Sequence, residues 1–264
     1  MSAAEGTRGG IPGETSGQRP AVQVLMPMGG LGSRFRAVGV DTPKPLIDVR
    51  GTPMFRRALA SFDGFAGDRR LLVVVREDAE REHGLAGLVR EAEPGAEVVL
   101  LDHDTRGAEE TCLTARHLLD PDAPLVVMDC DIAFDSPAYL RALAELPGSD
   151  VDGLLLSFRS QDPRYSFAEV GEDGLVVRTA EKRAISEHAL MGAYTFARAG
   201  AFLDAADVLL QRQVGEAMPE YYVSLVYNEL LRTGRRVGLV EGDFYCFGTP
   251  EELRLYLETG EPVR

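Results

Sequence analysis

The apolar run "AVQVLMPM" at residues 21 to 28, followed directly by the glycine-rich "GGLGSR", constrains the fold more than any other stretch of the sequence. An uninterrupted apolar run of this length that ends in a turn signal is typical of a strand buried on both faces. Strands of this kind occur in parallel sheets that helices cover on both sides. The run therefore predicts an α/β protein whose first strand leads into a tight loop.

The rest of the N-terminal half continues this alternation. Apolar, β-branched runs at "LLVVV" (71 to 75), "EVVLL" (97 to 101) and "PLVVMD" (124 to 129) are separated by segments with helical spacing, such as "MFRRALASF" and "AEETCLTARHLL". This order predicts a largely parallel sheet. After about residue 150, "VDGLLLSF", "LVVRTAEK" and "ALMGAYTFA" are separated by turns instead of helices. The second half is therefore predicted to contain mixed or antiparallel strands.

The two ends of the chain differ in character. Near the C-terminus, "FGTPEELRLYLE" predicts a helix with Thr249 as N-cap, Pro250 in the first turn and Glu252 completing a capping box. Residues 1 to 20 are rich in Gly, Ser, Thr and Pro and contain no apolar run, which predicts a disordered leader instead of a signal peptide. Residues 21 to 264 are predicted to form a single domain.

Charge and cysteine content limit the classes of partner. The formal net charge of -14 argues against nucleic acid or an anionic membrane as a partner, so a polyanionic substrate would require positive charge gathered locally. Cys112, Cys130 and Cys246 lie far apart and match no metal-ligand spacing. We expect buried free thiols in a reducing compartment, and hence a cytoplasmic protein. No segment approaches the roughly 18 apolar residues of a membrane span.

The loop "MGGLGSRF" after the first strand is the first candidate site, because ligands on open α/β sheets bind beyond the carboxyl ends of the strands. A dinucleotide fingerprint would require glycine where Phe35 stands, and a P-loop would end in Gly-Lys-Ser or Gly-Lys-Thr. The glycines that remain would let backbone N–H groups approach a phosphate closely, with Arg34 as a fork-shaped donor. A purely structural turn is the alternative interpretation.

Lysine is rare in this chain. Of the 28 Lys and Arg residues, only Lys44 and Lys182 are lysines. Lys44 lies between Pro43 and Pro45 in "TPKPL", where the two prolines disfavour a helix and predict a stiff, extended mount for the side chain. Lysine is a compact point charge that can follow a moving phosphate, whereas arginine is a planar fork.

Together, "LMPMGGLGSRF" and "TPKPLIDVRGTPM" resemble the signature of the sugar-phosphate nucleotidylyltransferases, also called nucleoside-diphosphate-sugar pyrophosphorylases. The segments "TRGAEET", "VVMDCDIAF", "EKRAIS", "MGAYTF" and "FGTPEEL" resemble the same family in the same order. This resemblance implies a Rossmann-like, glycosyltransferase-A-type mixed sheet with helices on both faces. Residues 21 to 264 would then form a single nucleotidyltransferase domain, and the N-terminal half would hold the nucleotide.

The implied reaction transfers a nucleoside monophosphate from a nucleoside triphosphate to a sugar 1-phosphate and releases pyrophosphate. The acceptor phosphate has a second pKa near 6 and is already ionised, so the reaction needs alignment and charge stabilisation instead of a general base. The resemblance implies that Arg34 holds the β- and γ-phosphates and that Lys44 bridges phosphates during transfer. The implied nucleotide-binding residues are Met28, Gly29, Gly30, Gly32, Ser33, Arg34, Lys44 and Gly107. The implied acceptor-binding residues are Glu181, Lys182 and Gly192.

Magnesium is the implied cofactor, because Mg²⁺ neutralises phosphate charge and is usually held by one or two carboxylates. Asp129 and Asp131 follow a buried strand, and Asp131 matches the metal aspartate of the family. The second metal aspartate of the family is Cys246 here, so Asp129 or Asp243 would have to replace it. A strand-end turn with capping aspartates is the alternative interpretation of this motif.

Other functions remain open at this point. A cytidylyltransferase that acts on a non-sugar phosphate or phosphonate would keep the chemistry and change the acceptor, and Arg183, where the family often has proline, allows such a pocket. The Asp-Cys-Asp sequence also fits a metal-dependent glycosyltransferase of the same fold, and Cys246 leaves room for a non-catalytic relative. The expected partners are a nucleoside triphosphate and a phosphorylated small-molecule acceptor. A homo-oligomer is compatible with the sequence.

Overall fold

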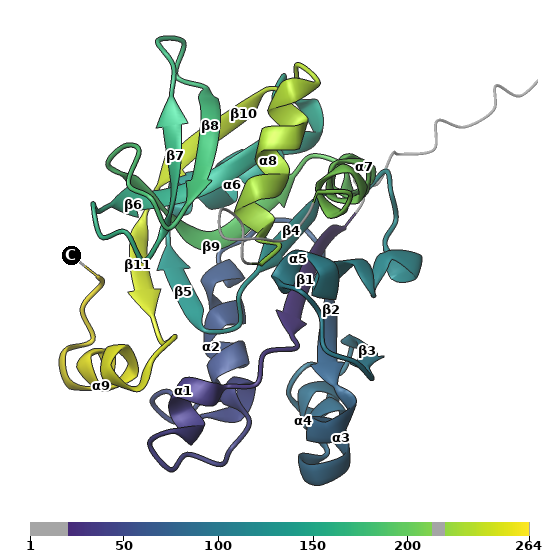
Figure 1. The fold of residues 1–264 in the computed structure, drawn as a ribbon, viewed down its shortest axis with the longest axis vertical. Coiled ribbons are helices and arrows are strands. Elements are labelled where there is room, and N and C mark those ends of the chain that lie inside the picture. The colour runs from purple at the N-terminus through teal and green to yellow at the C-terminus, as the bar shows by residue number, and fades with distance from the viewer. Residues whose placement is uncertain (1–20, 213–219, 264) are drawn as a thin grey trace, which may run out of the picture.

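The computed structural model describes residues 21–212 and 220–263, so the leader predicted at residues 1 to 20 lies outside the described residues. Figure 1 shows a central sheet with helices packed against it. Its strands are β1 (Val22–Met28), β2 (Arg69–Arg76), β3 (Glu97–Leu101), β4 (Leu125–Met128), β6 (Gly153–Arg159), β7 (Ser166–Val170), β8 (Val176–Glu181), β9 (His188–Phe196) and β10 (Val237–Glu241). A second, two-stranded sheet pairs β5 (Ile132–Asp135) with β11 (Asp243–Cys246).

Helices occupy several of the connections between these strands, and one helix follows the last strand. They are α1 (Ser33–Arg36), α2 (Met54–Leu59), α3 (Glu77–His83), α4 (Leu85–Ala92), α5 (Ala108–Leu113), α6 (Pro137–Glu145), α7 (Ala199–Leu210), α8 (Val223–Arg232) and α9 (Pro250–Thr259). The short 3-10 helices are η1 (Lys44–Leu46), η2 (Ala60–Phe62), η3 (Arg116–Leu118) and η4 (Leu146–Gly148).

Strand direction changes between the two halves of the chain, as the sequence predicts. The order in the large sheet is β10-β6-β9-β4-β1-β2-β3, with β7 and β8 attached beside β9. β1 runs parallel to β2 and β4, and β2 runs parallel to β3. β9 runs antiparallel to β4, β6 and β7, and β7 pairs antiparallel with β8. Helical crossovers allow the parallel pairs, whereas a turn joins the antiparallel β7–β8 pair.

Successive side chains of each strand enter opposite halves of the core, because a strand has a period of two. Val24 and Met26 of β1 pack in one cluster with residues of α2, α4 and α6. Leu25, which lies between them, packs in a second cluster with residues of α5, α7 and α8. The predicted mixed sheet with helices on both faces is therefore confirmed. Within the described ranges no helix has the length and apolar character needed to cross a bilayer.

A third, smaller core fixes the C-terminal helix next to the glycine loop. Phe35 of α1 and Leu253 of α9 are buried in one cluster. Figure 1 shows α1 and α9 at the lower left, below β5 and β11. The Thr249 side chain accepts a hydrogen bond of 3.1 Å from the backbone N–H of Glu252, which confirms the predicted N-cap. The Glu252 carboxylate pairs with Arg164 at 2.8 Å, so it serves a tertiary contact in addition to its place in the first turn.

The cysteines are free thiols, as expected. Cys112 and Cys130 are buried, and Cys246 is half-buried.

Glu109 of α5 is a buried carboxyl group. Its side chain is 0% exposed, and neither carboxylate oxygen has a hydrogen-bond partner in the described part of the chain. Burial, together with the negative charges of Glu110 and Asp207, raises the pKa of Glu109 from 4.5 to about 8. Arg106 opposes this shift, but it does not outweigh burial.

This shift predicts a loss of stability as pH rises. Between pH 4.5 and about 8 the folded chain keeps a proton on Glu109 that the unfolded chain has released, so the free energy of unfolding falls with rising pH. Glu109→Gln removes this titration. Relative to wild type, we expect the variant to gain at least about 1 kcal/mol in urea unfolding between pH 5 and pH 8, because one pKa unit corresponds to about 1.4 kcal/mol.

Glu110→Gln is the matched control. The Glu110 carboxylate accepts hydrogen bonds from Arg106, including one of 2.6 Å, and these bonds lower its pKa. Its loss should give no such gain at high pH. Parallel stability curves for wild type and Glu109→Gln would contradict the prediction.

Candidate active site

A cavity of about 870 Å³ opens where β1 and β4 end. Most of the residues that the sequence singles out line it: Met28, Gly30, Arg34, Lys44, Asp129, Asp131, Glu181, Lys182 and Gly192. The others do not line it: Gly29, Gly32, Ser33, Gly107 and Asp243. We call this cavity the cleft. Its donor side is formed by the glycine loop and α5, and its acceptor side is formed by β7, β8 and α8.

The glycine loop on the donor side packs closely against its neighbours. A Cβ added to Gly29 would lie 2.9 Å from Leu101 Cδ2 and 3.1 Å from Thr111 Cγ2. Gly32 has φ 63°, and a Cβ there would lie 3.4 Å from the Cβ of Lys44. The absence of side chains thus lets the loop approach both β3 and the Lys44 segment.

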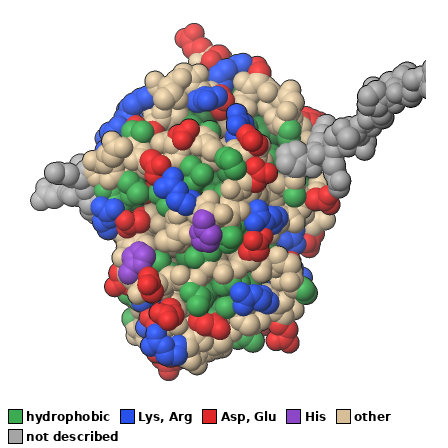
Figure 2. Space-filling view, turned by 90° about the vertical axis from the view of Figure 1, so that its right-hand side faces the viewer, with side chains coloured by type: hydrophobic (Ala, Val, Ile, Leu, Met, Phe, Trp, Pro, Cys, Tyr) green, Lys and Arg blue, Asp and Glu red, His purple; other side chains and the backbone are tan. Residues whose placement is uncertain are grey.

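Arg34 is exposed in the cleft and makes no ion pair with any described residue. Most surface arginines are paired, for example Arg116 with Asp207 at 2.8 Å and Arg178 with Glu169 at 2.7 Å. Figure 2 shows basic and acidic side chains interspersed over one face in this way. An unpaired guanidinium at the cleft is therefore a free donor for an anionic ligand.

Lys44 makes an ion pair with Asp131, and both side chains are about four-fifths buried. Burial, the largest influence, would by itself lower the pKa of Lys44. The charge and hydrogen bond of Asp131, together with Cys130 and Asp129, outweigh burial and raise the pKa overall. Lys44 is thus held as a cation. The expectation of an extended conformation is wrong at this residue. Pro43 is extended, but Lys44 begins the 3-10 helix η1, since proline is tolerated in the first turn of a helix.

Asp129 depends on the absence of a side chain at Gly192. The backbone N–H of Asp129 donates to the Gly192 carbonyl at 2.9 Å. Gly192 has φ 84°, and an added Cβ would lie 2.5 Å from Asp129 Oδ2. Burial, reinforced by the charge of the neighbouring Asp131, raises the pKa of Asp129. A bound cation would oppose both effects and favour the ionised carboxylate.

The carboxylates of the cleft fit a magnesium ion. Asp129 and Asp131 both line the cleft, and Mg²⁺ prefers one or two carboxylates completed by water and phosphate oxygens. Cys246 also lines the cleft, but thiolates suit softer metals. Asp243 lies at the other end of β11, opposite Asp135, and does not reach the cleft. Within residues 21–212 and 220–263, no group of three or more His, Cys, Asp or Glu residues is arranged to hold a metal by itself.

On the acceptor side, Glu181 ends strand β8 and Lys182 follows it directly. Glu181 Oε2 accepts hydrogen bonds from Ser166 and, at 2.8 Å, from Ser224. Burial raises the pKa of Glu181, and these hydrogen bonds partly offset the effect. Lys182 Nζ donates to the Tyr222 hydroxyl at 2.8 Å. Arg183, the next residue, turns away and lines a separate cavity.

The sequence interpretation missed several side chains of the acceptor side. Tyr165, Ser166 and Tyr222 line the cleft, and Ser224 supports it from α8. They come from the start of β7, from Tyr165 directly before it, and from the N-terminus of α8. The spacings that separate these segments from "EKRAIS" match no motif. The tyrosine pair in "EYYVS" directly before a helix was the available signal.

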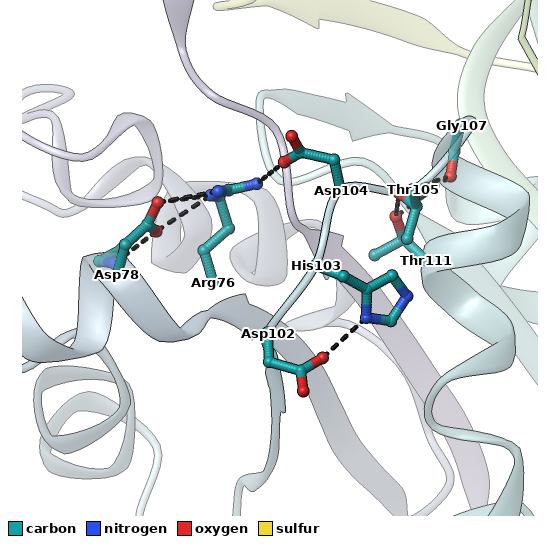
Figure 3. A network of polar contacts seen from close by, with 9 residues as sticks. Arg76, Asp78, Asp102, His103, Asp104, Thr105, Gly107 and Thr111 are labelled. Carbon is teal, nitrogen blue, oxygen red and sulfur yellow. Dashed lines mark hydrogen bonds and ion pairs between the residues drawn. The ribbon is translucent and has the colours of Figure 1, made fainter.

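Figure 3 shows the polar contacts that hold the loop after β3, which leads into Gly107 and α5. Arg76 at the end of β2 donates to Asp78 at 3.0 Å and to Asp104 at 2.7 Å, which ties this loop to α3. Further along, the Thr105 and Thr111 hydroxyls lie 2.6 Å apart. These contacts therefore fix the position of the loop that leads into Gly107.

Gly107 packs directly against the backbone of Tyr221. A Cβ added to Gly107 would lie 2.3 Å from the Tyr221 carbonyl oxygen and 2.6 Å from its nitrogen. Tyr221 N–H donates to the Arg106 carbonyl at 2.9 Å, on the same side. A packing reason for glycine thus exists at this position, independent of any nucleobase.

Gly107→Ala should accordingly be strongly destabilising, because the clash is with backbone atoms that cannot move as a flexible side chain can. Gly174→Ala is a suitable control, since Gly174 has φ 78° and an added Cβ would meet nothing within 4 Å. We expect Gly107→Ala to lower the free energy of unfolding by about 1–3 kcal/mol more than the control does. Equal losses in urea unfolding would contradict the packing argument.

Comparison with known proteins identifies the family. Residues 24–193 match the MobA-like NTP transferase domain. This match covers more than half of the chain, and the chain belongs to this family. The resemblance to nucleotidylyltransferases is therefore confirmed.

Curated relatives match at lower identity. The bifunctional protein GlmU of Cupriavidus pinatubonensis is 28% identical over 167 residues, which are 63% of this chain and 34% of that protein. The mannose-1-phosphate guanylyltransferase catalytic subunit beta of Drosophila pseudoobscura pseudoobscura is 25% identical over 177 residues, which are 66% of this chain and 46% of that protein. The chain thus spans between a third and a half of the length of these relatives.

Solved structures match over nearly the whole chain. The nucleoside-diphosphate-sugar pyrophosphorylase from Vibrio cholerae has a TM-score of 0.76 and 26% identity, and the match covers 89% of this chain and 100% of that one. The inositol-1-phosphate CTP transferase from T. maritima has a TM-score of 0.69 and 17% identity, with 93% and 100% covered. At this identity the second structure shows a shared fold alone.

Proposed function

We propose that this chain transfers a nucleoside monophosphate from a nucleoside triphosphate to a sugar 1-phosphate or a similar phosphorylated acceptor. An acceptor phosphate oxygen attacks the α-phosphorus, the bond from this phosphorus to the bridging oxygen breaks, and pyrophosphate leaves. The observation that carries the proposal is that Arg34 and Lys44 line the same cleft as Glu181 and Lys182. Groups suited to two phosphate-bearing substrates thus face one another.

Each cation has a distinct role in this proposal. Arg34 has no ion pair among the described residues, so its guanidinium is available as a bidentate donor to the β- and γ-phosphates. Lys44 would leave Asp131 for phosphate oxygens and follow the charge as it moves to the leaving group. No histidine lines the cleft within the described residues, and none is required, because the acceptor phosphate is already ionised near neutral pH.

Asp131 and Asp129 are the residues that we propose hold Mg²⁺, with Asp129 preferred to Asp243 because it lines the cleft. When bound, the ion would neutralise part of the negative charge of the phosphates. Glu181 would accept hydrogen bonds from acceptor hydroxyl groups, while Lys182 meets the acceptor phosphate. Gly107, packed against Tyr221, would place its backbone near the nucleobase.

The proposed partners are small molecules, and the proposed location is the cytoplasm. The free thiols at Cys112, Cys130 and Cys246 support a reducing compartment. The match to a nucleoside-diphosphate-sugar pyrophosphorylase supports a sugar phosphate as acceptor.

A matrix of substrates tests this function. ATP, GTP, CTP, UTP and dTTP are each combined with glucose 1-phosphate, mannose 1-phosphate, N-acetylglucosamine 1-phosphate, inositol 1-phosphate, phosphocholine and 2-aminoethylphosphonate in the presence of Mg²⁺. We expect pyrophosphate release with at least one sugar 1-phosphate. Turnover only with inositol phosphate, phosphocholine or the phosphonate would instead assign a non-sugar acceptor. No release in any well by folded protein would overturn the proposal.

Lys44→Arg tests the role of the lysine. The positive charge is kept, but a planar guanidinium cannot reproduce the contacts of an ammonium. The site is also closely packed, since a Cβ added to Gly32 would lie 3.4 Å from the Lys44 Cβ. We expect kcat to fall by about 10² to 10³, the usual effect of removing one preorganised donor, while calorimetry still detects binding of the triphosphate. Arg36→Lys, in α1 and outside the cleft, is the control and should retain wild-type turnover. Near-wild-type turnover of Lys44→Arg would exclude a catalytic role specific to lysine.

A further inference from the structure

Residues 221 to 224, which we call the bridging segment, contact both sides of the cleft. On the donor side, Tyr221 N–H donates to the Arg106 carbonyl at 2.9 Å, and Glu109 N–H donates to the Tyr221 carbonyl at 3.2 Å. The Arg106 guanidinium also lies 4.8 Å from the centroid of the Tyr221 ring. The start of the segment is therefore bound to the turn that contains Gly107.

On the acceptor side, the same segment holds both members of the Glu181–Lys182 pair. The Tyr222 hydroxyl accepts from Lys182 Nζ at 2.8 Å, and Nζ lies 4.8 Å from the centroid of the tyrosine ring. Ser224 Oγ donates to Glu181 Oε2 at 2.8 Å. Tyr222 and Ser224 thus contact the Lys182 ammonium and the Glu181 carboxylate, the two groups that bind the acceptor in the proposed reaction.

The bridging segment is itself firmly held. Tyr221 is 1% exposed and Ser224 is 0% exposed. The Ser224 carbonyl accepts from Thr179 Oγ1 at 2.7 Å, and the Asn228 side chain makes two hydrogen bonds to the Thr179 backbone, of 2.9 Å and 3.0 Å. These contacts join α8 to β8, so the bridging segment cannot shift without disturbing the strand that carries Glu181.

Lys182 is in particular need of an external support. Its backbone has φ 51°, a left-handed conformation that few non-glycine residues adopt, and it is exposed. No carboxylate lies within ion-pair distance of its Nζ in the described ranges. A free lysine side chain loses considerable rotamer entropy when a ligand immobilises it. An ammonium has three donors, so the Tyr222 hydroxyl can occupy one and leave the others for a phosphate.

We propose that Tyr222 and Ser224 are positioning residues for the acceptor: Tyr222 aims the Lys182 ammonium, and Ser224 orients the Glu181 carboxylate. The inference rests on the proposed function. It adds that acceptor recognition is built on the same backbone segment that packs against the Gly107 turn.

Kinetics with the acceptor found in the substrate matrix test this proposal. We expect Tyr222→Phe to raise the KM for the acceptor about tenfold, the usual scale for losing one hydrogen bond to a charged group, and to leave the KM for the triphosphate unchanged. Ser224→Ala should have a smaller effect in the same direction, because Ser166 also donates to Glu181. Tyr245→Phe, in β11 and outside the cleft, is the control for loss of a tyrosine hydroxyl.

A double-mutant cycle distinguishes positioning from general structural support. In a Lys182→Ala background, Tyr222→Phe should cause no further rise in the acceptor KM, because the group that it aims is gone. A further tenfold rise would overturn the proposal, as would an unchanged acceptor KM in Tyr222→Phe alone.

A binding measurement keeps this inference separate from the proposed function. Because the chain contains only Lys44 and Lys182, protein labelled with ¹³C at lysine Cε gives only two side-chain signals, and Lys182→Arg assigns them. Titration with inorganic phosphate should shift the Lys182 signal, with an affinity about tenfold weaker in Tyr222→Phe. A Tyr222-dependent shift without turnover in any well of the matrix would overturn the proposed function alone. Turnover with equal phosphate affinities in wild type and Tyr222→Phe would overturn the positioning role alone.

Discussion

The parallel pairing of β1 with β4 is the constraint on which the whole site depends. Leu25 faces Val127 in this register, so both strands leave the sheet at the same edge. The loop after β1 and the aspartates after β4 therefore meet, although about a hundred residues separate them in sequence, and Lys44 reaches Asp131. The antiparallel partner of β4 completes the arrangement, because β9 brings Gly192 beside Asp129.

Charge is distributed so that the acidic chain can still accept anions. With a formal net charge of -14, the protein as a whole repels a triphosphate, and attraction must come from a few nearby cations. In the cleft, Arg164 is already paired with Asp162 and Glu252, whereas Arg34 is not paired within the described residues. Lys44 is paired, but its partner is the carboxylate proposed to hold Mg²⁺. Binding of the ion and movement of Lys44 toward phosphate would then favour each other. The ion would replace the positive charge that Lys44 takes away from Asp131, and the departure of Lys44 would remove a positive charge that repels the ion.

The sequence predicted the N-terminal half of this arrangement better than the C-terminal half. The burial of Val24, Leu25 and Met26 on alternate faces of the sheet and the order of strands and helices follow from local patterns. Ligands bind beyond the carboxyl ends of parallel strands, and this rule then places Arg34 and Asp131. Contacts between distant segments follow no local pattern. Tyr222 reaches Lys182 only through the docking of α8 on β8, and the antiparallel β5–β11 pairing decides that Cys246, and not Asp243, enters the cleft. The turn at Lys44 was misjudged because proline restricts the backbone without excluding a single 3-10 turn.

The rarity of lysine acquires a physical meaning from these contacts. Each of the two lysines lines the cleft and, among the described residues, is held by a single acceptor, Lys44 by Asp131 and Lys182 by Tyr222. An ammonium can keep one donor on such a holding group and turn the others toward a phosphate, since its donors radiate from one atom. A guanidinium presents its donors in a plane and is best satisfied by a pair of coplanar acceptors, as Arg76 is by the two oxygens of Asp78. At a site where a cation must be both held and shared, the compact charge is the suitable one, and the arginines of this chain lie mainly where a static pair is sufficient.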